Sequence, residues 1–145
     1  MNDRIRIKSL LALCLGIAVV IMTATKVLAG TSTVSGTVGS VSVRGEKTII
    51  QYSNRWDGIV RSLSFTQPIG TIGYTTWTIQ QKCNNVTNYW QQFPGDVNYN
   101  SSEYFDGRKV YYNCGGSITM INTGTHDFKQ GSQTWRPSLT RTEYR

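Results

Sequence analysis

The polar run DVNYNSSEYFDG, residues 96–107, has the side chains of a cation site. Asp96, Asn98 and Asn100 alternate as the first ligands of a calcium loop do, because Ca²⁺ takes roughly six to eight oxygen ligands. The match then ends, since Ser101 stands where the loop needs a glycine and Gly107 where it needs a bidentate glutamate. Asn and Asp are also typical of turns, so a polar loop leading into a hairpin is favoured over a calcium loop. We therefore predict no metal site and no cofactor.

Catalytic groups are few. The single histidine, His126, is the one side chain whose ordinary pKa lies near neutral pH, and its neighbour Asp127 would face the opposite side of a strand. The carboxylates available for a glycosidase pair are Asp57, Asp96, Glu103 and Asp106. Nothing sets two of them at the separation that glycoside hydrolysis requires, and no G-x-S-x-G motif is present. We predict that the protein is not an enzyme, with a small hydrolase as a less favoured alternative.

Aromatic residues are the other unusual feature. All 16 of them follow residue 29, and several flank segments rich in Asn, Gln and Ser. Flat rings beside amide side chains suit sugars, whose CH faces stack on rings and whose hydroxyls form hydrogen bonds. The candidate ligand-binding residues are Trp90, Tyr89, Tyr99 and Tyr104. For any single one of them packing in the core is favoured over ligand binding, because aromatic residues also favour strands. Trp90, in the polar run 83–92, is the one most expected to be exposed.

Of the three cysteines, Cys14 lies in an N-terminal apolar run, which leaves Cys83 and Cys114 as a pair. In an oxidising compartment such a pair predicts one disulfide. It would close a loop of about 32 residues, worth roughly 3.7 kcal/mol in the chain-entropy model. Zinc is the alternative, but two thiols and His126 give at most three ligands, without C-x-x-C spacing.

The first 29 residues have the pattern of a secretory signal peptide. The positive n-region consists of Arg4, Arg6 and Lys8. An apolar run of 13 residues follows at 10–22, and Val27-Leu28-Ala29 offers small residues at the cleavage site. An uncleaved membrane anchor is the alternative, although a spanning helix needs about 20 apolar residues. We expect residues 1–29 to be removed, so that the protein meets the membrane only during export.

The remaining residues, 30–145, are expected to form one secreted domain. They carry 11 basic and 7 acidic side chains, a net charge of +4, and the basic residues are scattered without a run. This pattern is poor for nucleic-acid binding. Asn85-Val86-Thr87 and Asn100-Ser101-Ser102 match the glycosylation acceptor pattern, which matters only in a eukaryotic host.

The elements that must position these residues are strands. Short β-branched and aromatic runs alternate with Gly, Asn, Asp and Pro throughout the domain. Asp57-Gly58 and Asp106-Gly107 are predicted to be the turns of two antiparallel hairpins, because Asp-Gly tolerates the positive φ of primed turns. The hairpins would join residues 48–56 to 59–65 and residues 103–105 to 108–113.

Further strands are predicted at 31–43, with a bulge or bend near Gly39, at 71–79 and at 117–121. A tight turn is expected at Gly115-Gly116 and another at Asn122-Thr123-Gly124. From Gln130 onward we expect a loop that ends in a frayed tail.

About seven short strands predict an all-β fold, a small antiparallel β-sandwich or a barrel held by one disulfide. The favoured function is a secreted, non-catalytic binding or surface-interaction module whose partner is an extracellular glycan or protein. The alternative is an antimicrobial or toxin-like protein that acts on cell envelopes. That alternative would need Arg136, Arg141 and Arg145 to cluster near Trp135.

Overall fold

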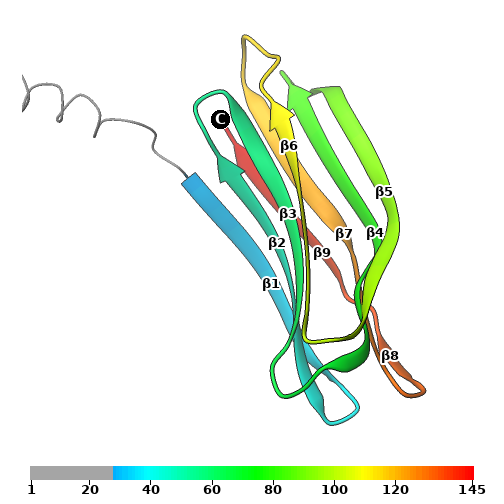
Figure 1. Ribbon diagram of the computed structural model, residues 1–145. Coiled ribbons are helices and arrows are strands. Elements are labelled where there is room, and N and C mark those ends of the chain that lie inside the picture. The colour runs from blue at the N-terminus through cyan, green and yellow to red at the C-terminus, as the bar shows by residue number, and fades with distance from the viewer. Residues whose placement is uncertain (1–27) are drawn as a thin grey trace, which may run out of the picture.

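A computed structural model describes residues 28–145 (Figure 1). Its strands are β1 (Leu28–Val38), β2 (Val41–Gln51), β3 (Arg55–Ser64), β4 (Ile69–Cys83), β5 (Val86–Ser101), β6 (Glu103–Tyr111), β7 (Ile118–Gln130), β8 (Gln133–Trp135) and β9 (Ser138–Tyr144). Within this range there is no helix, and hence none that could cross a membrane. Most of the predicted signal peptide, residues 1–27, lies outside the described residues.

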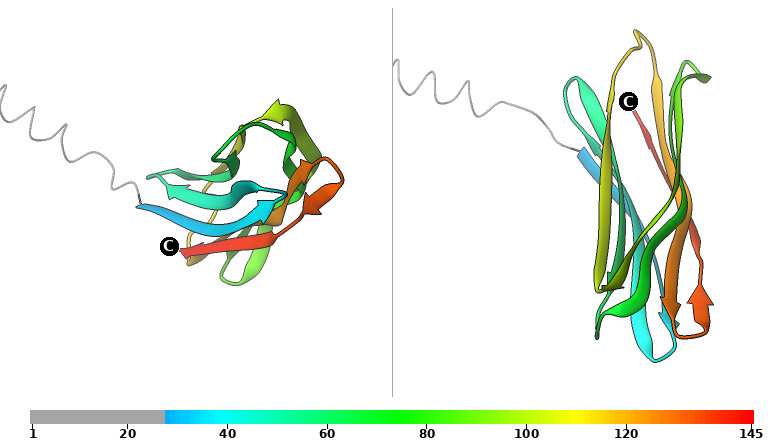
Figure 2. Two further views of the ribbon diagram at one scale, coloured as in Figure 1. Left: turned by 90° about the horizontal axis from the view of Figure 1, so that it is seen from below. Right: turned by 45° about the vertical axis from the view of Figure 1, so that its right-hand side comes forward.

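The strands form two antiparallel sheets, as the sequence predicted. One sheet has the order β1-β2-β3-β6, and the other has the order β5-β4-β7-β8, with β9 also paired to β7. Strand β7 pairs with β8 through its last residues and with β9 through residues 119–125. Figure 2 shows the two sheets as facing layers, with β1 and β9 side by side at one edge.

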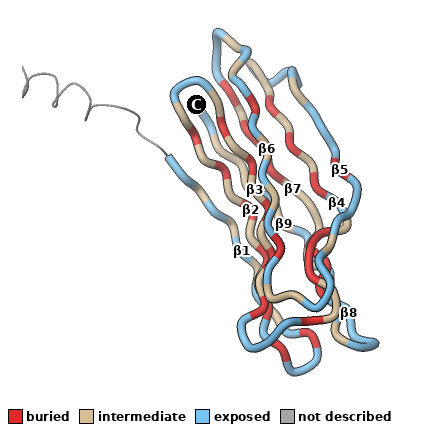
Figure 3. Tube along the Cα trace, viewed as in Figure 1, coloured by how far each residue is buried: buried red, intermediate tan, exposed pale blue. Residues whose placement is uncertain are grey.

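The core lies between the sheets and follows from the period-two pattern of the strands. Every second residue of β3 is buried, from Trp56 to Ser64, because successive side chains of a strand point to opposite faces (Figure 3). The facing sheet contributes Trp77, Ile79 and Phe128, none of which retains exposed surface. The opposite side chains of the same strands are left to form the outer faces.

The predicted turn at Asp57-Gly58 is wrong, because both residues lie inside β3. The turn between β2 and β3 comes earlier, where the amide of Tyr52 donates to the carbonyl of Arg55 at 2.8 Å. A Cβ on Gly58 would lie 3.1 Å from both the Ile79 side chain and the Trp56 ring. Glycine is used here to admit large core side chains, and the chain does not turn.

The predicted turn at Asp106-Gly107 is wrong as well. Both residues lie inside β6, where Gly107 is opposite Ile59 of β3. Within the strand, Asp106 accepts a hydrogen bond from the Arg108 guanidinium at 2.5 Å. Residues 96–101, expected to form a loop, belong to β5. A strand explains their alternation of polar and apolar side chains better than a turn does.

Four further expectations are corrected. Residues 31–43 form a hairpin, since the chain reverses at Gly39, whose φ is +62°. Asn122-Thr123-Gly124 lies in the middle of β7. The residues after Gln130, expected to be a loop and a frayed tail, form β8 and β9. Both strands are held in place by their pairing with β7. The tight turn expected at Gly115-Gly116 is wrong, because these residues form a bend within the longer connection 112–117 from β6 to β7. The predicted strand at 71–79 is confirmed, since it lies within β4.

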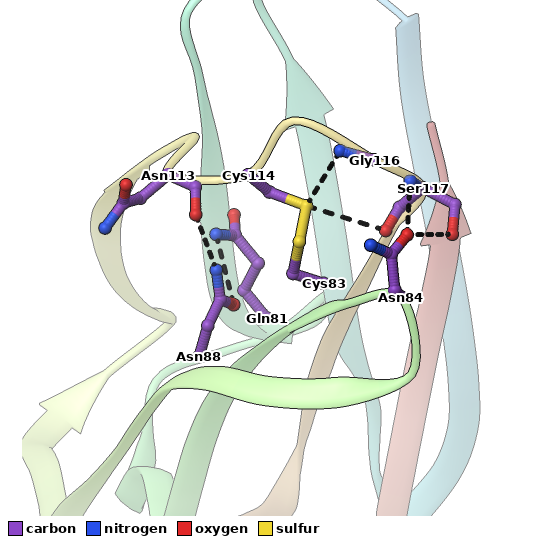
Figure 4. Close-up of a disulfide and its surroundings, with 8 residues drawn as sticks. All are labelled: Gln81, Cys83, Asn84, Asn88, Asn113, Cys114, Gly116 and Ser117. Carbon is purple, nitrogen blue, oxygen red and sulfur yellow. Dashed lines mark hydrogen bonds between the residues drawn. A yellow bond between two sulfur atoms is a disulfide. The ribbon is translucent and has the colours of Figure 1, made fainter.

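The predicted disulfide joins Cys83 and Cys114, whose Cα atoms are 5.7 Å apart (Figure 4). Cys83 is the last residue of β4, and Cys114 lies in the connection from β6 to β7, so the bridge ties the two sheets together at one end. Beside it, Asn84 accepts hydrogen bonds from the amide of Ser117 at 3.1 Å and from its hydroxyl at 3.3 Å. Asn84 and Asn85 both have positive φ and form the turn from β4 to β5.

Candidate functional site

Three of the four aromatic residues singled out in the sequence lie on β5, which forms one edge of its sheet. Trp90 is 57% exposed and Tyr99 is 74% exposed. Tyr89 is partly buried against the core, and its hydroxyl donates to Gln91 at 2.7 Å. Trp90 and Tyr99 therefore present free ring faces.

Tyr104 lies elsewhere, inside the core. Only 5% of it is exposed, and its ring packs edge-on against Tyr74 at 5.4 Å between centroids. Its hydroxyl donates to Asp96 at 3.0 Å, and burial raises its pKa well above the ordinary value. Tyr104 thus contacts β5 from the core side through its hydrogen bond to Asp96, and its ring is not accessible to a ligand.

The outer surface of β5, β4, β7 and β9 carries two neighbouring rows of side chains, which we call the threonine-rich face. Residues that pair across antiparallel strands point to the same face of the sheet. The first row consists of Gln92, Thr78, Thr123 and Thr140, and the second of Trp90, Gln80, Ile121 and Thr142. Adjacent side chains are about 4.8 Å apart across the strands and about 6.7 Å along them.

Hydrogen bonds between neighbouring hydroxyls order part of this face. The hydroxyl oxygens of Thr123 and Thr140 are 2.6 Å apart, and in the adjoining row those of Thr125 and Ser138 are 2.8 Å apart. Every side chain in the two rows is uncharged. The threonine-rich face is thus a neutral array of hydroxyl and amide groups, with an exposed indole at its β5 edge.

The outer face of the other sheet is different, because it is charged. There Glu46 pairs with Arg44 at 2.9 Å and approaches Arg61 at 3.9 Å, and Arg61 pairs with Glu103 at 2.6 Å. Such exposed pairs contribute little to stability but keep a sheet face solvated. The neutral composition of the threonine-rich face is therefore specific to one side of the molecule.

An extra residue in β4 brings Tyr99 to the same side as Trp90. Tyr74 pairs with His126 and Thr76 pairs with Thr125, so Thr75 has no counterpart on β7. Such a bulge reverses the alternation of side chains along the strand. Strand β5 follows β4 through this shift, and the even-numbered Trp90 and the odd-numbered Tyr99 consequently both face outward.

A hollow of about 430 Å³ lies next to Tyr99 and is lined in part by Asp96, Val97 and Asp127. Gly73 pairs with Val97 on one side and Asp127 on the other, so a position without a side chain separates them. A Cβ at Gly73 would come within 2.7 Å of the Val97 Cα, and only glycine fits there. Asp127 shares the outward row of Gly73 and Val97, whereas Asp96 pairs with the buried Tyr74 and turns its carboxylate toward Tyr104. The hollow thus combines an exposed aromatic ring with one outward carboxylate, that of Asp127.

Both carboxylates are held in place. Asp127 accepts a hydrogen bond from Arg136 Nε at 2.7 Å. Asp96 accepts from the amide of Val97 at 2.9 Å through Oδ1, and from the Tyr104 hydroxyl through Oδ2. Both Asp96 oxygens are thus occupied within the protein, whereas the outward Asp127 carboxylate is oriented and keeps acceptor capacity for a ligand hydroxyl.

The structure pairs a serine with the single histidine, which the sequence did not predict. Ser62 Oγ lies 2.8 Å from His126 Nδ1, and the same hydroxyl donates to the carbonyl of Gly73 at 2.8 Å. Both side chains are fully buried, and burial together with the charge of Lys47 lowers the pKa of His126 to about 3. Asp127 points outward, away from this pair. Ser62 and His126 therefore form a core hydrogen bond that a substrate cannot reach.

The three C-terminal arginines are engaged separately. Arg136 pairs with Asp127, and Arg141 pairs with Glu143. The Arg145 guanidinium lies 4.3 Å from the centre of the Tyr112 ring and donates to a backbone carbonyl. Trp135 stacks on Phe128 in the core, 5.5 Å between centroids. The cationic cluster that an envelope-acting protein would need is therefore not assembled in this way.

No group of three acidic, histidine or cysteine side chains capable of holding a metal ion occurs within residues 28–145. The amide of Asn98, one of the residues with calcium-like spacing, donates to the carbonyl of Glu103 at 2.9 Å. This contact links the end of β5 to the start of β6.

The comparisons with known proteins assign no family. No family model matches the chain, and no curated protein matches it. A solved structure with some likeness is described as the crystal structure of a protein from Archaeoglobus fulgidus. It is 8% identical, with 83% of this chain and 96% of that chain covered, at a TM-score of 0.37. A likeness at this level carries no argument about function.

The rows of the threonine-rich face were not recognised in the sequence, although a signal was available. Thr119, Thr123 and Thr125 occur at alternate positions with Ile121, which is the period of a half-exposed strand. Which threonines on other strands lie beside them depends on strand order and register. These are properties of the folded sheet.

Proposed function

We propose that the protein is a non-catalytic binding module for an extracellular glycan, and that the threonine-rich face binds the glycan. The observation that carries the proposal is the neutral pair of hydroxyl and amide rows that ends at the exposed Trp90. Neutral sugars offer hydroxyls for hydrogen bonds and CH faces for stacking on an indole. Because the face and a neutral sugar offer matching groups, a neutral glycan is supported over a charged partner.

The proposal includes secretion, because the ligand is extracellular. The N-terminal pattern of residues 1–29 supports export, and the disulfide between Cys83 and Cys114 is consistent with an oxidising compartment. Mass spectrometry of the secreted protein is expected to find a chain that begins near Gly30. A chain that retains Met1 on the membrane would contradict this part of the proposal.

The binding function is tested with the Trp90→Ala variant and a panel of insoluble and soluble neutral polysaccharides. We expect at least one polysaccharide to bind the wild type, and Trp90→Ala to weaken that binding roughly tenfold, as loss of an aromatic anchor does. Because Trp90 is exposed at a sheet edge, we expect Trp90→Ala to fold as the wild type does, and circular dichroism checks the fold.

The matched control is Phe105→Ala, since Phe105 is 60% exposed on the charged outer face of the other sheet. This variant is expected to bind as the wild type does. Equal losses in both variants would point to non-specific adsorption, and no binding to any polysaccharide would contradict the proposal. Binding to anionic vesicles at low salt, with none to glycans, would favour the envelope-acting alternative.

A further inference from the structure

We infer that the glycan is an extended polysaccharide chain that lies along β5 and contacts both Trp90 and the hollow beside Tyr99. This inference rests on the proposed function and adds the direction and minimum length of the ligand. Both rings are highly exposed, and both face outward from the same strand because of the extra residue at Thr75. Two anchors on one line favour a linear ligand.

The separation of the anchors sets the length of the ligand. Trp90 and Tyr99 are nine positions apart on β5, which corresponds to about 30 Å at the rise of an extended strand. A single sugar ring cannot reach both. A chain that engages both ends gains affinity because its second contact forms at high effective concentration.

The path between the anchors is uncharged. The outward side chains along it are Gln92, Pro94 and Val97 of β5 and Thr76 and Thr78 of β4. In the described part of the chain β5 is an edge strand that pairs with β4 alone, so the path is open along its free side. A neutral chain would meet amide, hydroxyl and apolar groups over the whole distance.

The hollow is suited to holding one ring of such a chain. Its volume of about 430 Å³ is within the range of small-ligand pockets, roughly 300–1,000 Å³. The Tyr99 ring can stack on a sugar face, while Asp127 can accept a hydrogen bond from one of its hydroxyls. We assign the exposed Trp90 the role of a flat platform.

The glycan could also run across the strands, and the experiment must distinguish that direction from the one along β5. Tyr144 of β9 is 72% exposed and lies on the same outer face, opposite Thr119. A chain that ran across the strands would contact Trp90 and Tyr144 in place of Trp90 and Tyr99. The threonine rows run in that direction, whereas the hollow beside Tyr99 lies on the line along β5.

The experiment uses neutral β-1,4-linked glucose and N-acetylglucosamine oligomers, and α-1,4-linked glucose oligomers, from two to eight rings. Calorimetry measures their affinities for the wild type and for Trp90→Ala, Tyr99→Ala and Tyr144→Ala. For one series, we expect the wild-type affinity to rise steeply once the oligomer reaches both anchors. Trp90→Ala and Tyr99→Ala should each remove that rise, roughly tenfold or more for the longest oligomer, while Tyr144→Ala keeps it.

Tyr111→Ala is the matched control, because Tyr111 is 61% exposed on the other sheet. If Tyr144→Ala removes the rise and Tyr99→Ala does not, the chain crosses the strands and the inference is wrong while the proposed function stands. An affinity independent of oligomer length would likewise overturn the inference and leave the proposed function standing. If no oligomer or polysaccharide binds any form, the proposed function fails and the inference fails with it.

Discussion

At the scale of single residues, Lys47 is the most unusual group of the core. Its side chain has no exposed surface, its Nζ has no hydrogen-bond partner among residues 28–145, and the Nζ lies 5.8 Å from the Trp77 ring centre. Burial lowers its pKa from 10.5 to about 7. The folded protein therefore holds the neutral amine from a lower pH than the unfolded chain does, because an apolar and aromatic environment accepts the neutral amine more readily than a cation.

This lowered pKa predicts that the free energy of unfolding changes with pH above neutrality. Between pH 7 and 10.5 the unfolded chain binds more protons at this lysine than the folded protein does, so stability rises with pH across that window. Below pH 7 the lysine is charged in both states, and its contribution no longer changes. The full shift corresponds to an upper limit of roughly 5 kcal/mol.

Lys47→Met is expected to stabilise the protein at pH 7 and to remove this rise. Urea unfolding at several pH values from 7 to 10 measures both effects. Lys109→Met is the control, since Lys109 is exposed on β6. A wild-type stability that rises no more steeply than that of Lys47→Met would show that Lys47 is charged in the folded protein.

At the scale of elements, the two Asp-Gly pairs show how packing overrides a local preference. Gly58 and Gly107 lie in neighbouring strands of one sheet, and neither has the positive φ that a primed turn requires. They differ in their surroundings, however. A Cβ at Gly58 would press on Ile79 and Trp56 at 3.1 Å, whereas at Gly107 the nearest atom would be 3.7 Å away.

These distances predict opposite effects for the same substitution. Gly58→Ala is expected to destabilise the protein by about 1–3 kcal/mol, as overpacking of a core does. Gly107→Ala is expected to be neutral or to stabilise it by about 0.4–1 kcal/mol, because the unfolded chain loses freedom. Chemical denaturation of both variants gives the comparison. Equal effects would show that the Gly58 site can relax.

At the scale of the whole molecule, the disulfide and the strand connections hold two sheets together. The bridge between Cys83 and Cys114 joins the end of β4 to the connection that leaves β6, across a sequence separation of 31. Closing such a loop lowers the entropy of the unfolded chain by an amount worth roughly 4 kcal/mol. Its position at one end leaves the threonine-rich face unobstructed.

The double variant Cys83→Ser, Cys114→Ser is therefore expected to lose roughly 2–5 kcal/mol of stability and to have a lower Tm. Glycan binding by the fraction that remains folded should be unchanged, because neither cysteine lies in the rows of that face. Thermal unfolding with and without reductant measures the first effect, and a binding assay at low temperature measures the second. An unchanged Tm would mean that the bridge does not restrict the unfolded chain enough to stabilise the fold, and would contradict this prediction.

Local patterns in the chain were sufficient to predict the class of fold and the disulfide. Period-two patterns such as β3 and the strand at 71–79 specify strands locally, because one face must be buried, and two cysteines leave a single pairing. The exposure of Trp90 was also predictable, because the residues around it are polar. These features depend on neighbours in the chain, which a sequence displays directly.

The turns, the burial of Tyr104 and the composition of the threonine-rich face depend instead on tertiary contacts. Asp57-Gly58 and Asn122-Thr123-Gly124 have turn propensities, but pairing on both sides holds them in central strands. Tyr104 is a core residue because β6 faces Tyr74 across the layers. The side-by-side arrangement of Thr78, Thr123 and Thr140 depends on register between strands up to 62 residues apart, and no local pattern encodes such a register.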